Sequence, residues 1–355
     1  MKNLGRVAAA AAVLMLAGGL TACGSNDDEG GGGGGGDSKK IALLLPESKT
    51  TRYEAFDHPL FEAKVAEECD DCEVVYFNAD QDENKQADQV DSAISQEVDV
   101  IVLDPVNGEA AAAKVADAQD ADIPVIAYDR FIEGADYYMS FDNQRVGELQ
   151  AESLVEATGG TGDILMLNGD PDDPNAAQFK EGAHSIIDDS DLNVVAEYDN
   201  PDWSPENAQE FTGDQLDKLD PTSIKGVYAA NDGQAGGAIA ALTEAGLAAD
   251  ALPPVTGQDA ELAAIQRIVA GEQYMTVYKP YPVEANKAAE VAVLIVNGDD
   301  VTGTTDFEGV KSFIFDPVVV TTDNVADTVV ADKLYSVEDI CTDDYAEACT
   351  TAGIE

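Results

Sequence analysis

The chain has 355 residues, enough for about two domains of ordinary size and a substantial buried core. Lys plus Arg number 19 against 70 for Asp plus Glu, which gives a formal net charge of −51 at pH 7. This negative field repels phosphate backbones, so we expect no nucleic-acid partner. With 45% hydrophobic and 25% charged residues, the composition is that of a folded protein rather than of a disordered acidic tail. Only His58 and His184 are present, which leaves almost no room for a zinc site built on several histidines.

Residues 1–22 predict a lipoprotein signal peptide. Lys2 and Arg6 precede an uncharged stretch of 14 residues (7–20), which is too short and too rich in Gly and Ala for a membrane span. The sequence Leu20-Thr21-Ala22-Cys23 then fits the bacterial lipobox, in which the cysteine thiol accepts a diacylglyceryl group. We therefore expect a lipid on Cys23 that holds the protein at the outer face of the cytoplasmic membrane. An ordinary secretory signal with an incidental cysteine is the alternative.

Residues 23–38 predict a flexible tether behind the lipidated cysteine. The seven consecutive glycines from Gly30 to Gly36 cannot repay the cost of ordering the backbone. This run matches the nucleotide-binding pattern G-x-G-x-x-G only trivially, because no strand precedes it and the acids at 27–29 would repel a pyrophosphate. A membrane-anchored body on a tether fits a protein that captures a solute and hands it over.

The other four cysteines form two pairs that are close in sequence, Cys69 with Cys72 and Cys341 with Cys349. In an exported chain this spacing favours two local disulfides. The two aspartates between Cys69 and Cys72 disfavour the thiolate that a redox-active pair needs. A zinc site of four thiolates is the remaining alternative, although the two pairs lie far apart in the chain. We expect no metal and no cofactor.

Short apolar runs alternate with helical patterns from Lys40 onward. The first runs are residues 41–45, 74–77, 100–103 and 124–128, with amphipathic segments around 53–68, 84–97 and 108–119 between them. The alternation restarts with runs at 163–167, 194–196, 226–230, 255–256 and 275–278, followed by a helix over roughly 282–297. Continuous apolar runs are typical of strands buried on both faces of a parallel sheet. We predict an α/β protein with two doubly wound parallel sheets and right-handed crossovers.

Polar residues follow these runs at the strand ends where open α/β sheets bind ligands. They are Asp104-Pro105, Asp129-Arg130, Asn168-Gly169-Asp170, Asn231-Asp232, Gln258-Asp259 and Lys279. Short amides, carboxylates and fixed cations from two domains that face one cleft match the donors and acceptors of a neutral polyhydroxy ligand. The sequence therefore predicts a carbohydrate site between the two sheets.

Several stretches carry a resemblance to a known family. They are residues 127–130 (Ala-Tyr-Asp-Arg), 140–143 with 146–150, 203–208 (Trp-Ser-Pro-Glu-Asn-Ala), 231–232 with 235–239, 257–260 (Gly-Gln-Asp-Ala) and 275–280. In these stretches, and over nearly the whole mature body, the chain resembles the type I periplasmic binding proteins of bacterial sugar importers, most closely the D-xylose-binding subfamily. The resemblance implies two Rossmann-like lobes that are joined by three hinge strands and close over one monosaccharide.

The same resemblance implies discontinuous lobes and a set of partners. The N-terminal lobe would comprise residues 39–143 and 281–311, and the C-terminal lobe residues 144–280 and 312–355. The protein would act as a monomer that binds a pentose, D-xylose above all, and delivers it to an ABC permease and its ATPase. It would not be an enzyme.

The resemblance also implies which side chains hold the sugar. Hydrogen bonds to hydroxyls and the ring oxygen would come from Arg52, Asp129, Arg130, Asn143, Asn175, Asn231, Asp259 and Lys279. Trp203 would stack on one face of the sugar. Tyr53 stands where the family usually has a second tryptophan, and would provide a smaller aromatic platform.

Each of these residues also has a simpler interpretation. Asp129 and Arg130 could form a structural ion pair at a strand end, Trp203 could anchor the edge of a lobe, and Lys279 could be a solvated lysine. His184 lies beside an apolar helix face and is expected at its boundary. The acids at 80–84 begin like a calcium loop, but lysine replaces the glycine that the turn needs, so they are expected to favour the start of the following helix.

Two other functional classes remain open. The closed form could engage a sensor kinase or a chemoreceptor rather than a permease. An exported carbohydrate-active enzyme would need two catalytic carboxylates about 5 to 10 Å apart around a glycosidic bond, and nothing singles out such a pair among the acids. The acidic excess itself fits either a protein adapted to concentrated salt or an extracytoplasmic protein without a salt requirement.

Overall fold

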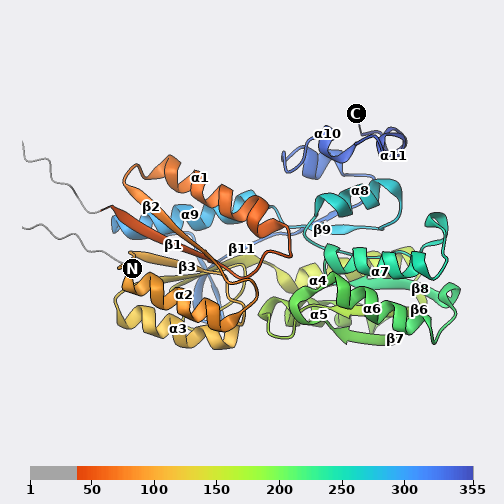
Figure 1. Cartoon of the computed structure of the whole chain (residues 1–355), viewed down its shortest axis with the longest axis horizontal. Helices are drawn as coiled ribbons and strands as arrows, with labels where there is room; N and C mark the ends of the chain where they lie inside the picture. The colour runs from red at the N-terminus through yellow and green to blue at the C-terminus, as the bar shows by residue number, and fades with distance from the viewer. Residues whose placement is uncertain (1–37, 355) are drawn as a thin grey trace, which may run out of the picture. The chain divides into compact units, whose positions relative to one another are not determined.

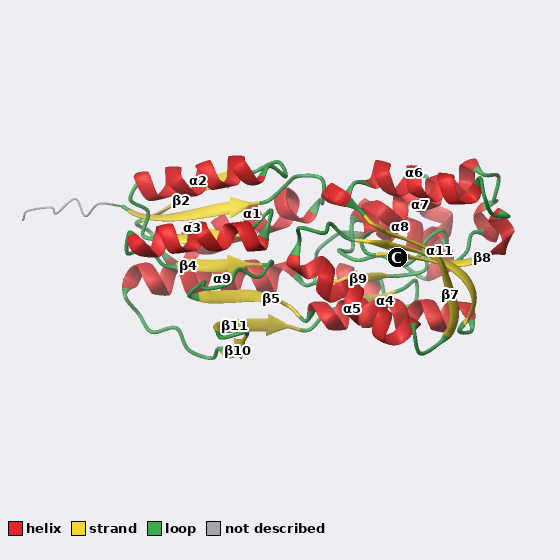
Figure 2. Ribbon diagram, turned by 90° about the horizontal axis from the view of Figure 1, so that it is seen from below, coloured by secondary structure: helices red, strands yellow, loops and turns green. Residues whose placement is uncertain are grey.

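The computed structural model describes residues 38–354. The predicted signal peptide, the lipidated Cys23 and the tether up to Asp37 lie outside the described residues. None of the helices within residues 38–354 combines the length and apolar character needed to cross a membrane. The described part contains two sheets, each covered by helices on both faces (Figures 1 and 2).

The first sheet has seven strands in the order β10-β11-β5-β4-β3-β1-β2, all parallel except for the antiparallel β10 at one edge. Its strands are β1 (Lys39–Leu45), β2 (Cys72–Asn78), β3 (Val100–Leu103), β4 (Val125–Tyr128), β5 (Tyr137–Phe141), β10 (Thr305–Phe307) and β11 (Val310–Phe315). β10 and β11 come from the C-terminal part of the chain, far in sequence from the other five strands. The four apolar runs predicted between residues 41 and 128 all form strands here.

Helices bury both faces of this sheet, as the continuous apolar runs predict. They are α1 (His58–Glu68) and α9 (Tyr281–Asn297) on one face, and α2 (Glu83–Ser95) and α3 (Gly108–Asp120) on the other. In β1, Ile41 and Leu43 pack in the cluster beneath α1 and α9, whereas Ala42 and Leu44 pack in the cluster beneath α2 and α3. This period of two, with both faces apolar, is why β1 lies in the middle of a parallel sheet.

The second sheet has a core of three parallel strands in the order β7-β6-β8. They are β6 (Thr161–Asn168), β7 (Asp191–Asp199) and β8 (Ile224–Ala229). Single bridges from Val227 to Val255 and from Gln258 to Val277 extend it to an antiparallel pair, β9 (Thr276–Tyr278) with β12 (Val318–Val320). Its helices are α4 (Asn143–Thr158), α5 (Pro174–Ile187), α6 (Pro205–Leu216), α7 (Asp232–Glu244) and α8 (Leu262–Ala270).

The chain crosses between the two sheets three times. The crossings follow β5, β9 and β11, and lead into α4, α9 and β12. The predicted lobe boundaries at 143/144 and 280/281 fall at the first two crossings. The third was expected at 311/312, but β11 pairs with β5 as far as Phe315, so this crossing comes after Phe315. The half-exposed β10 at the sheet edge and β11 beside it carry no long apolar run, which is why the sequence pattern did not predict them.

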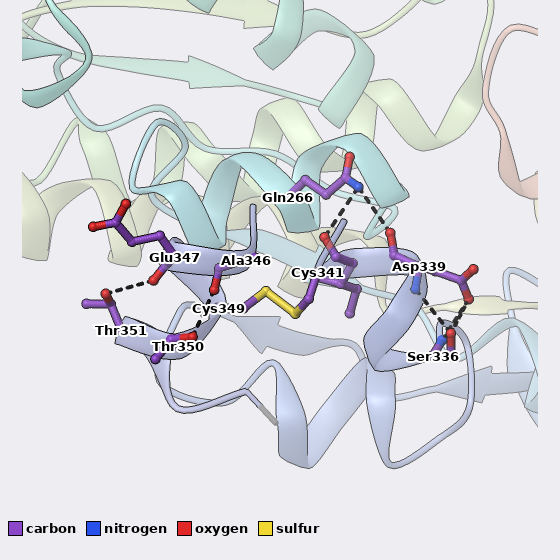
Figure 3. Close-up of a disulfide and its surroundings, with 10 residues drawn as sticks. Gln266, Ser336, Asp339, Cys341, Ala346, Glu347, Cys349, Thr350 and Thr351 are labelled. Carbon is purple, nitrogen blue, oxygen red and sulfur yellow. Dashed lines mark hydrogen bonds between the residues drawn. A yellow bond between two sulfur atoms is a disulfide. The ribbon is translucent and has the colours of Figure 1, made fainter. Parts of the chain in front are cut away.

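Both predicted disulfides are present, Cys69–Cys72 and Cys341–Cys349. The second closes a C-terminal segment that contains α10 (Val337–Ile340) and α11 (Ala346–Ala352) and packs on α8 (Figure 3). Gln266 of α8 donates hydrogen bonds to the backbone carbonyls of Asp339 and Ile340. The disulfide thus cross-links the C-terminal segment internally, and the contacts with α8 hold this segment against the second lobe.

Candidate functional site

A small cavity lies where the carboxyl ends of the strands of both sheets meet, with an empty volume of about 260 Å³ that includes space open to solvent. Its lining residues come from both lobes. They are Thr50, Tyr53, Asp129, Arg130, Asp173, Asn175, Phe179, Trp203, Asn231, Gln258, Asp259 and Lys279. The cavity is small and its lining is mostly polar, as expected of a site for a small polar molecule.

Asp129 presents its carboxylate at the end of β4. Arg52 Nη1 donates to its Oδ1 at 3.2 Å, and the Tyr53 hydroxyl donates to its Oδ2 at 3.0 Å. Burial alone would raise the pKa of Asp129, but the positive charges of Arg52, Lys279 and Arg130 outweigh it and lower the pKa to about 2. Asp129 is therefore a permanently charged acceptor.

Arg52 lies behind the cavity and does not line it. Its guanidinium forms ion pairs with Asp57 at 2.9 Å and with Glu284 of α9 at 2.7 Å, in addition to the pair with Asp129. Its carbon Cζ lies 4.8 Å from the centre of the Tyr281 ring. All four charged groups are at most 2% exposed. Arg52 thus orients Asp129 from behind rather than facing the ligand space.

Asn143 also lies outside the lining. It is the first residue of α4, at the first crossing between the lobes, and its side-chain amide donates to the Ser140 hydroxyl at 3.2 Å. Eight of the ten residues that the sequence predicted to hold the ligand line the cavity, and Arg52 and Asn143 are the other two.

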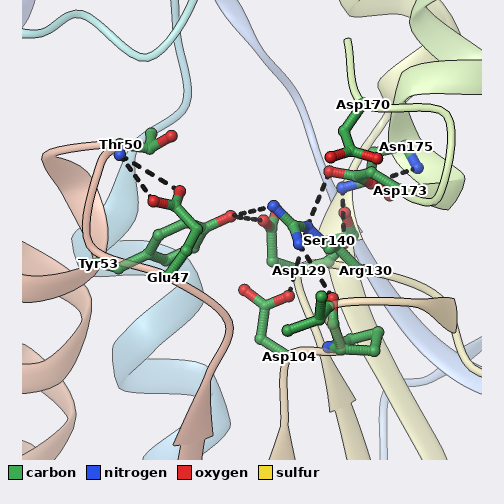
Figure 4. Close-up of polar contacts among 12 residues, drawn as sticks. Glu47, Thr50, Tyr53, Asp104, Asp129, Arg130, Ser140, Asp170, Asp173 and Asn175 are labelled. Carbon is green, nitrogen blue, oxygen red and sulfur yellow. Dashed lines mark hydrogen bonds and ion pairs between the residues drawn. The ribbon is translucent and has the colours of Figure 1, made fainter. Parts of the chain in front are cut away.

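Arg130 reaches across the cavity to the second lobe. Its Nε lies 2.8 Å from Oδ2 of Asp173 (Figure 4). The same oxygen accepts from the indole Nε1 of Trp203 at 3.1 Å. Asp173 also caps α5 by accepting from the backbone N–H of Asn175 at 2.8 Å. Burial raises the pKa of Asp173, and Arg130 opposes this shift. Arg130 and Asp129 do not pair with each other among the described contacts, so the alternative of a local Asp129–Arg130 ion pair is wrong.

Trp203 and Phe179 form the apolar wall of the cavity. Their ring centroids are 6.3 Å apart in an edge-to-face arrangement. Trp203 is 5% exposed and packs closely against Gly169, where a Cβ would overlap the indole ring. It therefore anchors the second lobe and also lines the cavity.

Asp259 and Lys279 form the polar wall on the second lobe. Lys279 Nζ lies 3.0 Å from Asp259 Oδ1 and 5.7 Å above the ring of Phe179. Lys279 is 3% exposed, so the alternative of a solvated lysine is wrong. Burial would lower the pKa of Lys279, but the carboxylates of Asp259 and Asp129 outweigh it and raise the pKa. The cation is retained at any physiological pH.

Besides Asp259 Oδ1, which is ion-paired with Lys279, two lining residues hold buried acceptors without a hydrogen-bond partner among the described residues. Oδ1 of Asn175 and Oε1 of Gln258 accept no hydrogen bond from residues 38–354. The amide of Asn175 donates across the cavity to the backbone carbonyl of Asp129 at 3.1 Å, and Asn231 accepts from the Gln234 N–H at 3.0 Å as the cap of α7. A ligand that donates hydroxyl hydrogens would satisfy both orphan oxygens.

The sequence prediction did not assign four lining residues to the ligand. Gln258 stands in the row of polar strand ends, and Asp173 directly precedes the predicted Asn175, so both had a signal nearby. Phe179 lies one helical turn after Asn175 on α5, and Thr50 lies in an irregular loop, so no sequence pattern indicated that either residue lines the cavity.

The remaining sequence expectations concern residues far from the cavity. His184 is half-buried and lies within 3.2 Å of Asp188 and Glu197, in agreement with a place at the boundary of a helix face. Asp82 caps α2, in agreement with the helix-start interpretation of the acids at 80–84. Within the described residues, the group with three side chains suited to a metal is Cys69, Asp71 and Cys72, and its two cysteines are joined in a disulfide.

The two lobes contact each other around the cavity as well as across it. At the rim, Gln81 donates to Asp170 at 3.2 Å and the backbone N–H of Thr51 donates to Glu261 at 3.4 Å. The two lining cations are both paired with lining carboxylates, and Asp129 is paired with Arg52. Because the charges compensate one another, the arrangement suits a neutral polar ligand rather than an ion.

Comparison with known proteins shows the family. The family described as the periplasmic binding protein domain matches residues 41–300. The chain belongs to this family. As a periplasmic binding protein it is 39% identical over 268 residues to the D-xylose-binding periplasmic protein of Escherichia coli, which covers 73% of this chain and 80% of that one. It is 35% identical over 310 residues to the D-xylose-binding periplasmic protein of Haemophilus influenzae, which covers 84% and 91%.

A solved structure agrees with this membership. The periplasmic binding protein superposes on an ABC transporter solute-binding protein of Clostridium phytofermentans, solved with β-D-glucose, with a TM-score of 0.77 and 26% sequence identity. The match covers 85% of this chain and all of that one. The type I fold, with two parallel-sheet lobes joined by three crossings, is therefore shared over almost the whole described chain.

Proposed function

We propose that this protein is the extracytoplasmic solute-binding component of an ABC sugar importer and that it binds one monosaccharide, D-xylose, in the cavity between its lobes. The observation that carries the proposal is the cavity itself. It is small, its charges are internally paired, and it holds unpartnered acceptors beside two aromatic rings. Two relatives that match most of the chain are named as D-xylose-binding proteins, which supports the choice of sugar.

The contacts follow from the chemistry of a pentose. Its hydroxyl groups would donate to Asp129, Asp259 and the orphan oxygen of Gln258, and accept from Arg130 and Lys279. Trp203 would cover its apolar C–H face. Charged hydrogen bonds contribute about 1.5 to 3 kcal/mol each, and a ligand that leaves one of these buried groups unpaired is rejected.

Release requires the lobes to separate at the three crossings. The ligand touches both lobes, so it stabilises the closed arrangement and shifts the population toward it. The closed form would then dock on a permease, whose ATPase drives import, and the sugar leaves unchanged. We propose that the protein acts as a monomer held at the outer face of the membrane through a lipid on Cys23.

Calorimetry and thermal-shift measurements over pentoses, hexoses and sugar alcohols test the sugar. D-xylose should give the largest shift, and the absence of a response to the whole panel would refute the proposal. Mass spectrometry of the membrane fraction, with Cys23→Ser as the control, tests the anchor. Incubation with aryl glycosides separates a binding protein, which should release no aglycone, from an enzyme that cleaves glycosidic bonds.

A further inference from the structure

Arg130 lies between two carboxylates that belong to different lobes. Its Nε is 2.8 Å from Asp173, at the start of α5 in the second lobe, and 3.6 Å from Oδ1 of Asp104, at the end of β3 in the first lobe. Figure 4 shows Asp104 and Asp173 on opposite sides of the guanidinium. The shorter contact is the one that crosses the cavity.

The other contacts of Arg130 tie it to the first lobe. Its Nη1 donates to the backbone carbonyl of Pro105 at 3.0 Å, and its Nη2 donates to the Tyr53 hydroxyl at 3.4 Å. When the lobes separate, Arg130 therefore moves with Asp104, and Asp173 moves away. The guanidinium is 2% exposed here and would lose its nearest counter-charge.

Asp104 has no other role in the described structure. It is fully buried, it does not line the cavity, and neither of its carboxylate oxygens has a hydrogen-bond partner among residues 38–354. A buried carboxylate without hydrogen bonds is costly, so a fold does not gain by holding one in this arrangement alone. The position of Asp104 becomes favourable if its carboxylate pairs with Arg130 in a second arrangement of the lobes.

We propose that Asp104 is a positioning residue that pairs with Arg130 when the lobes open. Arg130 then pairs with Asp173 in the closed form and with Asp104 in the open form. This rests on the proposed sugar-binding function and deepens it. The exchange keeps Arg130 paired in both states and so lowers the free-energy cost of opening. Asp104 thereby weakens ligand affinity in favour of release.

The charges around Asp104 support this role. Burial raises its pKa well above the usual value in the closed arrangement, Arg130 and Arg52 oppose the shift, and Asp129 and Asp173 reinforce it. Separation of the lobes removes Asp173 and admits water, which lowers the pKa again. Closing should therefore take up protons at Asp104, and low pH should favour closure.

The test compares wild type with Asp104→Asn, which keeps the shape of the side chain and removes its charge. Without the charge of Asp104, the open form lacks the carboxylate that replaces Asp173, whereas the closed form keeps Asp173. Asp104→Asn should therefore bind D-xylose about three- to tenfold more tightly, because a larger fraction of the protein is closed before binding. Its ligand-free form should be more compact by small-angle X-ray scattering, and xylose should dissociate more slowly in stopped-flow measurements.

Three controls make the result specific. Asp173→Asn should have the opposite effect on the ligand-free form, which should become more open. Asp91→Asn, an acid on α2 paired with Lys114, should change neither property. Calorimetry in buffers of different ionisation enthalpy should show proton uptake on binding that Asp104→Asn reduces. Asp104→Ser provides a second variant if the amide impairs folding.

Weaker xylose binding by Asp104→Asn would overturn the proposal and indicate a direct ligand contact. Unchanged affinity and unchanged scattering, with a loss of stability alone, would overturn it in favour of a structural role. Failure of wild type to bind any sugar refutes the proposed function instead. The scattering comparison of the ligand-free forms still decides the role of Asp104 in that case.

Discussion

Asp129 and Asp259 occupy equivalent places in the two lobes. Each follows the fourth strand segment of its sheet, and each donates its backbone N–H to the next strand, to Met139 and Val277, at 2.9 Å. Both have positive φ angles, 57° and 90°, which are unfavourable for a residue with a Cβ. Such strain is retained where it serves a site, and here it aims two carboxylates into one cavity from opposite lobes.

The amide variant Asp259→Asn tests this arrangement. It keeps the backbone preference for unusual φ but removes the charge that we propose binds a sugar hydroxyl, so sugar affinity should fall about 10- to 100-fold. Isothermal calorimetry measures the loss. Asp250→Asn, at an exposed position of the same lobe, is the matched control and should bind as wild type.

A methyl group at Gly169 should displace the aromatic wall. The Cβ of an alanine there would overlap the Trp203 ring and come within 2.7 Å of the Ala176 Cβ. Because Trp203 is the single tryptophan, Gly169→Ala should shift the intrinsic emission to longer wavelength and weaken sugar binding. A shifted spectrum with unchanged affinity would show that the ring does not hold the ligand. Gly213→Ala, at an open helical position, serves as the control.

The Thr276 hydroxyl holds the strained loop of Asp259 from below. It donates to Oδ2 of the buried Asp232 at 2.9 Å and accepts from the backbone N–H of Ala260 at 3.1 Å. Thr276→Val leaves the buried Ala260 N–H unpaired and removes one of the hydrogen bonds to Asp232, which keeps those from Glu261 and Gln273. The free energy of unfolding should therefore fall by about 1 to 3 kcal/mol. Urea denaturation without ligand checks this, and a loss below about 0.5 kcal/mol would contradict it.

Stability should depend on pH through Glu261. Burial, together with the charges of Asp259 and Glu47, raises its pKa to about 7, against the opposing effects of the Thr51 N–H and Arg267. The folded state binds the proton more tightly than the unfolded state, so this contribution is fully present below about pH 4.5 and is lost as the pH rises through 7. Glu261→Gln should therefore be more stable than wild type at pH 8, and the difference should vanish by pH 4.5. Melting temperatures across this range measure it, and a difference that does not depend on pH would contradict the assignment.

The acidic surface predicts a dependence of stability on salt. A net charge of −51 destabilises the folded state by self-repulsion, and raising NaCl from 0.1 to 1 M shortens the Debye length from about 10 Å to about 3 Å. The melting temperature should rise steeply between low and molar NaCl. Sucrose at equal osmolality is the control and should have a smaller effect. A melting temperature that does not change with NaCl concentration would favour an acidic protein without a salt requirement.

The sequence alone determined most of the architecture. The continuous apolar runs and the helical segments between them predicted two parallel α/β sheets, because the burial of a strand on both faces is a local property of its residues. Asp129, Arg130 and Asp259 were predicted at one site for a related reason, because each lies within three residues of the end of a buried run. The local disulfides followed from spacing in the chain.

Only the tertiary structure decided how the site is assembled. Arg52 lies in the loop where the sequence analysis placed it. Its guanidinium nevertheless lies behind the cavity, because it pairs with Asp57 and with Glu284, which is 232 residues away in the sequence. Phe179 and Thr50 enter the lining through the packing of a helix and the path of a loop. Arg130 pairs with Asp173 only because the two lobes lie against each other. A contact between lobes depends on their relative position and leaves no periodic pattern in the sequence of either lobe.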